Sequence, residues 1–167
     1  NRAAARDAAD LLLSEGHSRI GIILDSLEIF TMRERLAGVE QAYQSAGLEL
    51  DATLVTAQAH DPESTARAVR AMLDAPAGPT AFLAGNNRAT VGIIEELFSA
   101  GRFARVVGFD DFETSHLMPR RTTIVDYDLA GLARDAATTL FRRIGGAVDA
   151  PEYHFTQTQL VERGLEQ

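Results

Sequence analysis

The sequence contains no cysteine and no lysine, and all 16 of its basic residues are arginine. The absence of cysteine excludes disulfides, thiolate metal ligands and cysteine nucleophiles. The absence of lysine excludes the phosphate-binding lysine of a P-loop, Schiff-base chemistry and Ser–Lys dyads. Hydrophobic residues never form a run near the roughly 18 residues that cross a bilayer, so we expect no membrane partner.

Acidic residues outnumber basic ones by 24 to 16, which gives a formal net charge of −8. A surface of this sign repels the phosphate backbone of nucleic acid, so contact with DNA would need a part of the protein outside this sequence. With 167 residues, 46% of them hydrophobic, the chain is long enough for one globular domain. It opens on NRAAARDAADLLL, without methionine and already in a helical pattern, so we expect part of a longer protein.

Helical and strand patterns alternate along the chain. Apolar residues at helical spacing predict helices at 4–15, 32–46, 61–73, 90–100 and 129–144. Short apolar or alternating runs predict strands at 19–25, 52–56, 79–85, 105–111, 122–128 and 153–161. Strands separated by helices form βαβ units, so the predicted fold class is α/β, a parallel sheet flanked by helices.

Polar residues follow four of the predicted strands, and Arg33 and Arg35 begin a helix entered from the same edge of the sheet. These strand-end residues are Asp25-Ser26, Asn86-Asn87, Asp110-Asp111 and Asp126-Tyr127-Asp128. Ligands of open parallel sheets bind outside the carboxyl ends of the strands. Carboxylates accept hydrogen bonds from hydroxyls, guanidinium groups donate them and amides do both. The pattern therefore predicts a pocket for a neutral, polyhydroxylated ligand, with Phe30, Phe112 or Tyr127 covering an apolar ring face.

The same residue types also serve purely structural purposes, because Asp and Asn are preferred as helix caps and in turns. In this interpretation Asn87 and Asp128 are helix caps, Asp111 is a turn residue, and Arg33 is a solvated charge. Asp110 and Arg35 stand at no position that a cap requires, so they remain the strongest ligand-binding candidates.

Sequence patterns of common enzymes are absent: there is no GxSxG, no GxGxxG and no HExxH, and the four histidines are scattered. One enzyme hypothesis stays open. Asp110 and Asp111 could hold Mg²⁺ for phosphoryl transfer, and His116 is a candidate for proton transfer nearby. The missing lysine counts against this hypothesis, and we expect neither catalysis nor a cofactor.

Six motifs occur together in one order along the whole chain. They are GHSRIGII (16–23), RERLAG (33–38), PTAFLAGNN (79–87), VVGFDD (106–111), TTIVDYD (122–128) and LVERG (160–164). In this order they resemble the LacI/GalR-type transcriptional regulators. The resemblance implies the effector-binding domain of those proteins, which has a type I periplasmic-binding-protein-like fold and senses a small molecule, usually a sugar or a nucleobase.

The resemblance also implies which residues bind the effector. The arginine before LAG corresponds to Arg35, and the hydroxyl residue four positions earlier corresponds to Thr31. The asparagine after the PTA strand corresponds to Asn86, the first acid of GFDD to Asp110, and the polar residue after the TT strand to Tyr127, where many relatives have glutamine. We add Phe112 as an aromatic candidate. Asn87 departs from the aspartate that is common at its position in the family.

Four segments follow from the resemblance. They are a crossover helix of a missing first lobe (1–18), the effector-binding second lobe (19–125), a crossover helix that packs on the first lobe (126–150), and a C-terminal strand and tail (151–167). Without the first lobe, the apolar stripes of the helices at 2–15 and 129–146 would be exposed. We therefore expect the chain to self-associate, to exchange elements or to fray there.

The resemblance implies the effector-sensing part of a cytoplasmic, homodimeric repressor. A small molecule, with a sugar favoured by the pocket chemistry, would modulate operator binding by a helix-turn-helix that precedes this sequence. An extracytoplasmic sugar-binding protein of a transporter would have the same fold, and it stays open as the alternative.

Overall fold

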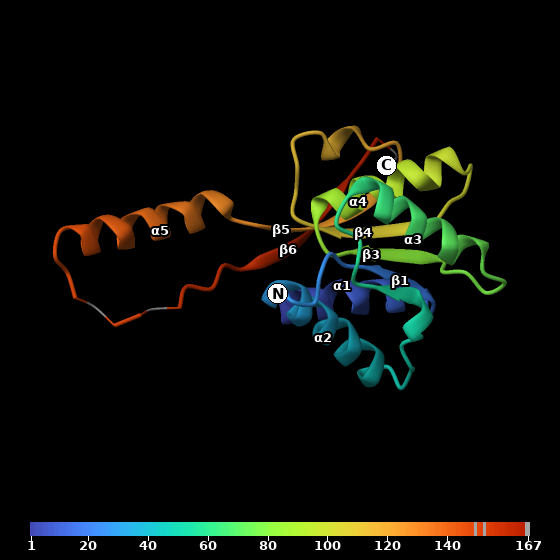
Figure 1. Cartoon of the computed structure of the whole chain (residues 1–167), viewed down its shortest axis with the longest axis horizontal. Helices are drawn as coiled ribbons and strands as arrows, with labels where there is room; N and C mark the ends of the chain where they lie inside the picture. The colour runs from blue at the N-terminus through green and yellow to red at the C-terminus, as the bar shows by residue number, and fades with distance from the viewer. Residues whose placement is uncertain (149, 152, 166–167) are drawn as a thin grey trace.

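A computed structural model describes residues 1–148, 150–151 and 153–165 of the chain. Its centre is a six-stranded sheet in the order β2-β1-β3-β4-β5-β6 (Figure 1). The first five strands in this order run parallel, and only β6 is antiparallel to its neighbour, β5. The strands are β1 Ile20–Ile23, β2 Val55–Thr56, β3 Ala81–Ala84, β4 Arg105–Phe109, β5 Thr122–Tyr127 and β6 Thr158–Arg163. The predicted fold class is confirmed.

Helices cover both faces of the sheet, as Figure 1 shows. The helices are α1 Arg2–Ser14, α2 Phe30–Ser45, α3 Pro62–Asp74, α4 Asn87–Ser99 and α5 Leu129–Ile144. Helices α1 and α2 share one apolar cluster with Ile20, Ile22 and Leu83 of the sheet. Helices α3 and α4 share another with Ile23 and Phe82. Successive side chains of a strand point to opposite faces, so β1 contributes to both clusters.

Helix α1 corrects one prediction. Its apolar residues were expected to be exposed for want of a first lobe, but Ala8, Ala9 and Leu12 are fully buried against α2 and the sheet. The alanine-rich face permits close packing because small side chains let two helix backbones approach each other. At Gly38 of α2, an added Cβ would collide with the carbonyl oxygen of Arg2. The stripe is therefore covered by α2 and the sheet.

Two predicted strands have different boundaries in the structure. Residues 52–54 form a 3₁₀ turn, in which Asp51 accepts a hydrogen bond from the backbone N–H of Thr53 at 2.9 Å, and only Val55–Thr56 form β2. The last strand, expected at 153–161, is β6, Thr158–Arg163. Tyr127 ends β5 and pairs with Thr158, so residues 153–157 have no strand to pair with. The expected tail also includes residues 152, 166 and 167, which lie outside the described part of the chain.

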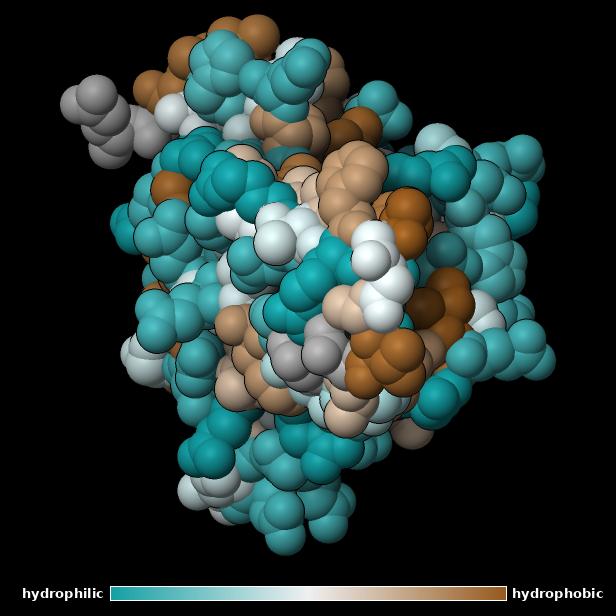
Figure 2. Space-filling view, turned by 90° about the vertical axis from the view of Figure 1, so that its left-hand side faces the viewer, coloured by the Kyte–Doolittle hydropathy of each residue, from teal (hydrophilic) through white to brown (hydrophobic). Residues whose placement is uncertain are grey.

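Helix α5 projects from the body of the molecule on the arm formed by β5 and β6 (Figure 1). None of its residues is buried, and Leu140, Phe141 and Ile144 are 58%, 70% and 72% exposed. Figure 2 looks onto the end of the molecule from which α5 projects and shows hydrophobic side chains gathered on that surface. Here the expected exposed stripe is confirmed.

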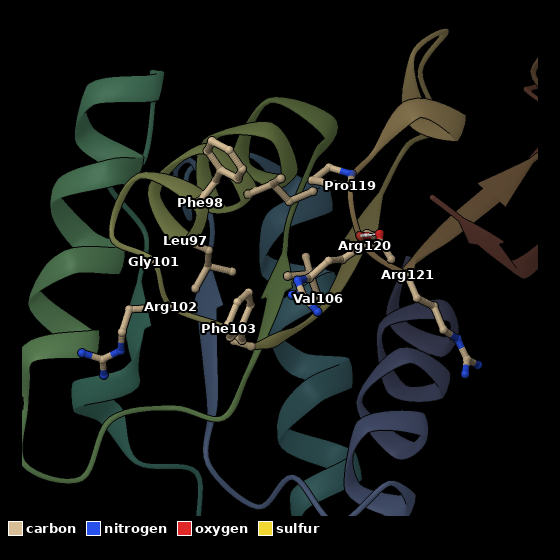
Figure 3. A pocket seen from close by; sticks show the side chains of 12 residues that line it. Leu97, Phe98, Gly101, Arg102, Phe103, Val106, Pro119, Arg120 and Arg121 are labelled. Carbon is tan, nitrogen blue, oxygen red and sulfur yellow. Dashed lines mark hydrogen bonds between the residues drawn. The ribbon is translucent and has the colours of Figure 1, made fainter. Parts of the chain in front are cut away.

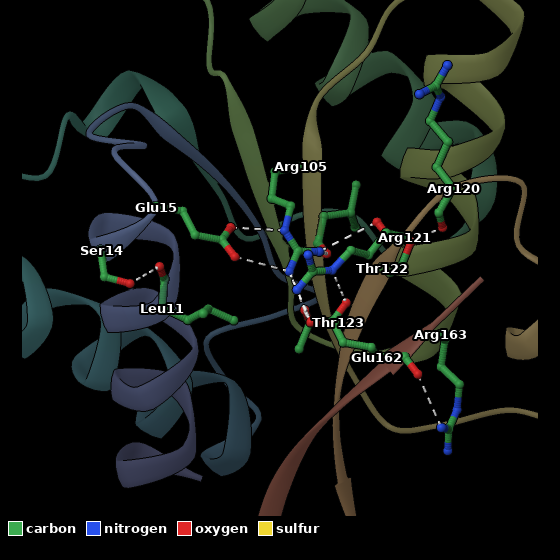
Figure 4. Close-up of polar contacts among 11 residues, drawn as sticks. Leu11, Ser14, Glu15, Arg105, Arg120, Arg121, Thr122, Thr123, Glu162 and Arg163 are labelled. Carbon is green, nitrogen blue, oxygen red and sulfur yellow. Dashed lines mark hydrogen bonds and ion pairs between the residues drawn. The ribbon is translucent and has the colours of Figure 1, made fainter. Parts of the chain in front are cut away.

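Arg105 joins α1 to three strands at the amino-terminal edge of the sheet (Figure 4). Its side chain is 12% exposed and forms ion pairs with Glu15 at 3.0 Å and Glu162 at 3.2 Å. It also donates to the hydroxyl of Thr123 at 2.5 Å. Arg121 binds the second carboxylate oxygen of Glu162 at 2.7 Å. This network fixes the end of α1 against β4, β5 and β6, far from the edge where the polar strand ends converge.

Candidate ligand-binding site

Arg35 lies at the carboxyl edge of the sheet, and only 8% of it is exposed. Its Nε donates to Oδ1 of Asn1 at 3.0 Å, and its Nη1 donates to the carbonyl oxygen of Gly85. Nη2 lies 3.5 Å from Oδ1 of Asp110, and the guanidinium carbon is 4.0 Å from the centre of the Phe109 ring. Burial lowers the pKa of Arg35, and the charge of the nearby Asp110 opposes this shift.

Asp110 has the only positive φ angle among the described residues other than glycine, at 68°. Its backbone N–H donates to the carbonyl oxygen of Val125 at 3.1 Å, which fixes the loop after β4 against β5. Aspartate tolerates the left-handed conformation better than most residues do. The sharp turn of the backbone brings the Asp110 carboxylate towards Arg35.

A cavity of about 320 Å³ opens beside Arg35, and Asp110 is not among the residues that line it. Three of the residues predicted to bind a ligand, Thr31, Arg35 and Tyr127, line it. Its other lining residues are Asn1, Ala4, Phe109, Val125, Leu132, His154, Phe155, Thr156 and Thr158. Burial and the nearby charge of Asp110 raise the pKa of Tyr127, so its hydroxyl keeps its proton at neutral pH. The cavity thus combines hydroxyl, amide and guanidinium groups with apolar walls, which suits a hydroxylated ring.

Asn86 does not line this cavity and serves as the N-cap of α4. Its Oδ1 accepts a hydrogen bond from the backbone N–H of Ala89 at 2.8 Å. The capping role was expected for Asn87, which is instead the first residue of the helix, so that expectation is wrong by one position. Among the described residues, the side-chain NH₂ of Asn86 has no hydrogen-bond acceptor, and it lies next in sequence to Gly85, whose carbonyl holds Arg35.

Phe112 and Asp111 face away from the cavity. Phe112 lines two other depressions, one with His116 and Arg163 and one with Val91 and Met118. The structure therefore does not bring it to Arg35. Asp111 accepts two hydrogen bonds from Arg163, at 2.7 and 3.1 Å, and one from the backbone N–H of Phe112 at 2.9 Å. It stabilises the loop, as expected for a turn residue.

Asp25 and Arg33 are engaged at the same edge. Asp25 binds Nδ1 of His60, which joins the loop after β1 to the loop after β2. Arg33, expected to be a solvated charge, donates to the carbonyl oxygens of Leu27 and Glu28 at 2.8 and 2.9 Å. It thereby fixes the loop that leads into α2. Asp128 caps α5 by accepting from the N–H of Gly131 at 2.8 Å, as predicted.

Sequence patterns gave no reason to select several residues of this site. Asn1 precedes a helix, Phe109 reads as a core strand residue, and Thr156 and Thr158 belong to the returning chain before and at the start of β6. The alternation of threonine and glutamine in FTQTQ (155–159) is the only pattern that could have placed Thr156 and Thr158 on the same polar face of this segment. Contacts between residues more than 30 positions apart are decided by packing, which the sequence pattern does not encode.

A second cavity, of about 350 Å³, lies at the opposite, amino-terminal edge of the sheet (Figure 3). Its lining is mainly apolar, with Leu97, Phe98, Phe103, Val106 and Pro119 around it. The guanidinium of Arg120 stacks on Phe103 at 3.9 Å from the ring centre, whereas Arg102 and Arg121 point away. With so few polar groups, this cavity is poorly suited to a hydroxylated ligand.

Neither a metal cluster nor a membrane helix occurs in the described part of the chain. No three His, Asp or Glu side chains there lie close enough together to hold a metal ion. None of the helices in the described ranges is both long and apolar enough to cross a bilayer. Asp110 and Asp111, which the phosphoryl-transfer hypothesis needs side by side on one ion, are instead directed to two different arginines.

Comparisons with known proteins give one consistent result. Residues 9–164 match the family model of the periplasmic binding protein-like domain. The regulator CelR of Thermobifida fusca is 29% identical over 98% of this chain and 49% of its own length. A probable opine utilization operon repressor of Rhizobium rhizogenes is 27% identical over 98% of this chain and 89% of its own length. The chain thus spans about half the length of CelR but most of the second relative.

Solved structures agree with the relatives in sequence. A complex of the transcriptional regulator CelR with cellobiose superposes with a TM-score of 0.87 at 30% identity, over 98% of this chain and 52% of that one. A putative LacI regulator from Bacillus cereus subsp. cytotoxis gives a TM-score of 0.89 at 25% identity, over 100% of this chain and 61% of that one. The similarity extends over the whole sheet with its flanking helices.

Proposed function

Because this chain belongs to the periplasmic binding protein-like domain family and its relatives are LacI-type transcriptional repressors, we propose that it is the effector-sensing part of such a repressor. One observation carries the proposal. Arg35 and Asp110 meet at the carboxyl edge of the sheet, beside a cavity lined by Thr31 and Tyr127. In this proposal residues 19–125 form the effector-binding lobe. Residues 126–150 lead towards a first lobe; position 149 among them is not described.

The effector in this proposal is a neutral sugar. The relatives suggest two chemical classes, since one is named for opines and another is solved with cellobiose. An opine carries carboxylates, which need a cation. Arg35 is already matched by Asp110, and Arg33 is engaged by two backbone carbonyls. Asp110, Asp25 and Asp126 also make this edge of the sheet negative, which disfavours an anion.

A thermal-shift panel tests this assignment. Cellobiose, glucose and other neutral sugars are compared with sugar acids and opines, on the wild type and on Asp110→Asn. A ligand at a hundredfold excess over its Kd stabilises the native state by about 2.7 kcal/mol. We expect a neutral sugar to raise the melting temperature of the wild type and to lose this effect in Asp110→Asn. Stabilisation by opines or sugar acids alone would contradict the neutral-sugar assignment.

The output of the protein is proposed to be operator binding. CelR is named an HTH-type regulator, and this chain covers half of its length, so we assign DNA contact to a helix-turn-helix outside this chain. The net charge of −8 supports this division, because this part repels DNA. We further propose a cytoplasmic homodimer. Mobility-shift assays of the full-length protein, with and without the sugar found above, test whether the effector changes operator affinity.

The two alternative functions receive less support. The relatives in sequence are transcriptional repressors rather than transporter components. They are also regulators rather than enzymes, and the separation of Asp110 from Asp111 by their arginine partners disfavours a shared Mg²⁺. Phosphatase assays with and without Mg²⁺ test the enzyme alternative directly.

A further inference from the structure

Asn1 stands at the start of α1, where the sequence suggested only the beginning of a helix. Its side chain makes no capping hydrogen bond to α1. Instead, its Oδ1 accepts the Nε–H of Arg35 at 3.0 Å, and Asn1 itself lines the cavity beside Arg35. A residue at an N-cap position normally satisfies backbone N–H groups of its own helix. Asn1 uses its carbonyl oxygen on a buried side chain 34 positions away.

The contact depends on how α1 docks against α2. The two backbones come close at Gly38, where an added Cβ would collide with the carbonyl oxygen of Arg2. Beside this point, Arg2 forms a bidentate ion pair with Glu34, at 2.7 and 3.1 Å. Ala4 and Ala5, which follow, are buried. The start of α1 is therefore fixed next to Arg35 by packing that does not itself involve the guanidinium.

Arg35 lines the cavity, and three further contacts hold its guanidinium there. Gly85 accepts from Nη1, Asp110 lies beside Nη2, and the ring of Phe109 covers one face. An arginine side chain has about 2 kcal/mol of rotamer entropy, which a ligand must otherwise overcome when it orders the side chain. A guanidinium that is already held on Nε presents its remaining N–H groups in fixed positions.

We propose that Asn1 is a positioning residue of the effector site: its side-chain oxygen fixes the Arg35 guanidinium in the orientation that faces the cavity, so the start of α1 is part of the site. The inference rests on the proposed function for the identity of the ligand, but the orientation of Arg35 can be measured without any ligand. Asn1 acts through Arg35 in this scheme and does not need to touch the effector.

The test compares Asn1→Ala with Arg2→Ala in the full chain. Arg2→Ala removes the ion pair to Glu34 at the same end of α1 but leaves the Asn1–Arg35 bond, so it controls for weaker docking of the helix. The first measurement is hydrogen exchange of the Arg35 Nε–H by NMR, with the signal assigned by its loss in Arg35→Gln. We expect exchange to be about tenfold faster in Asn1→Ala and nearly unchanged in Arg2→Ala.

The second measurement is the affinity for cellobiose by calorimetry, which we expect to fall roughly 3- to 10-fold in Asn1→Ala. Asn1→Asp keeps an oxygen acceptor, so we expect exchange of the Arg35 Nε–H to be slow again in this variant. If Asn1 only helped to dock α1, this recovery would not be expected. Equal exchange rates in wild type and Asn1→Ala, or equal effects of Asn1→Ala and Arg2→Ala, would overturn the proposal. If cellobiose does not bind the wild type, the neutral sugar found in the thermal-shift panel replaces it. If no neutral sugar binds, the sugar assignment fails, and the exchange data alone decide the role of Asn1.

Discussion

At the scale of single residues, Asp110 combines an unusual backbone conformation with a side chain that faces a buried cation. Its φ of 68° is unfavourable for any residue with a Cβ, and its carboxylate is the acidic neighbour of Arg35. Asp110→Ala and Asp110→Gly both remove the carboxylate, but only glycine also removes the backbone strain. We expect Asp110→Gly to be more stable than Asp110→Ala by about 1 kcal/mol. Urea denaturation of the two variants measures the difference, and equal midpoints would argue against strain at this position.

Asp111 gives the protein a specific sensitivity to acid. Burial by itself raises the pKa of this carboxyl, but hydrogen bonds from Arg163, Ser115 and the backbone N–H of Phe112 together lower the pKa below its ordinary value. A carboxyl whose pKa is lowered by folding contributes stability above its unfolded pKa of about 4, and the contribution is lost as pH falls through the folded value. We expect Asp111→Asn to be less stable than the wild type at pH 7, with the difference shrinking below about pH 4. Unfolding free energies measured between pH 7 and pH 3 check this, and a constant difference would exclude Asp111 as the titrating group.

At the scale of elements, α1 and α5 have similar amphipathic sequences but opposite surroundings. Leu12 of α1 is fully buried, whereas Leu140 of α5 is 58% exposed. We expect Leu12→Ala to destabilise the chain by about 2–4 kcal/mol, because it leaves a cavity in the core. For the monomer, at low protein concentration, Leu140→Ala should change the unfolding free energy by less than about 0.5 kcal/mol. Chemical denaturation of the matched pair at such a concentration tests this, and a large effect of Leu140→Ala in the monomer would mean that α5 packs against its own chain.

Some helix boundaries could be predicted from the local sequence, and others could not. Asp61-Pro62 predicted the start of a helix, and the structure has Asp61 accepting from the N–H of Ser64 with Pro62 as the first helical residue. Asn86 and Asn87 could not be separated in the same way, because both are good capping residues and the choice depends on where β3 ends. The partners of the α1 stripe could not be predicted from local patterns either, since they belong to α2 and the sheet, which are separate elements of the chain.

At the scale of the whole molecule, the exposed stripe of α5 predicts self-association of this chain. We expect the 167-residue chain to form dimers or larger species as its concentration rises, because apolar area is removed from water. Phe141→Ser with Ile144→Ser should suppress association without loss of stability, since both side chains are exposed. Analytical ultracentrifugation measures this. The matched control is Phe98→Ser with Phe103→Ser, at the second cavity. If the control pair suppressed self-association instead, the surface through which the chains associate would lie on α4 and the loop after it.

The sequence alone determined the α/β class, the absence of thiol and lysine chemistry, and the presence of Arg35, Asp110 and Tyr127 at one edge of the sheet, while Thr31 was selected only through the family resemblance. These conclusions depend on local periodicity, on residue chemistry, and on the rule that parallel strands end at the same edge. Only the tertiary structure decided that α1 is covered by α2 and the sheet, that Phe112 faces elsewhere, and that Asn1 and Phe109 hold the Arg35 guanidinium. Those outcomes depend on side-chain packing between segments far apart in the chain, and a local pattern does not specify which of several apolar or polar partners a side chain will meet.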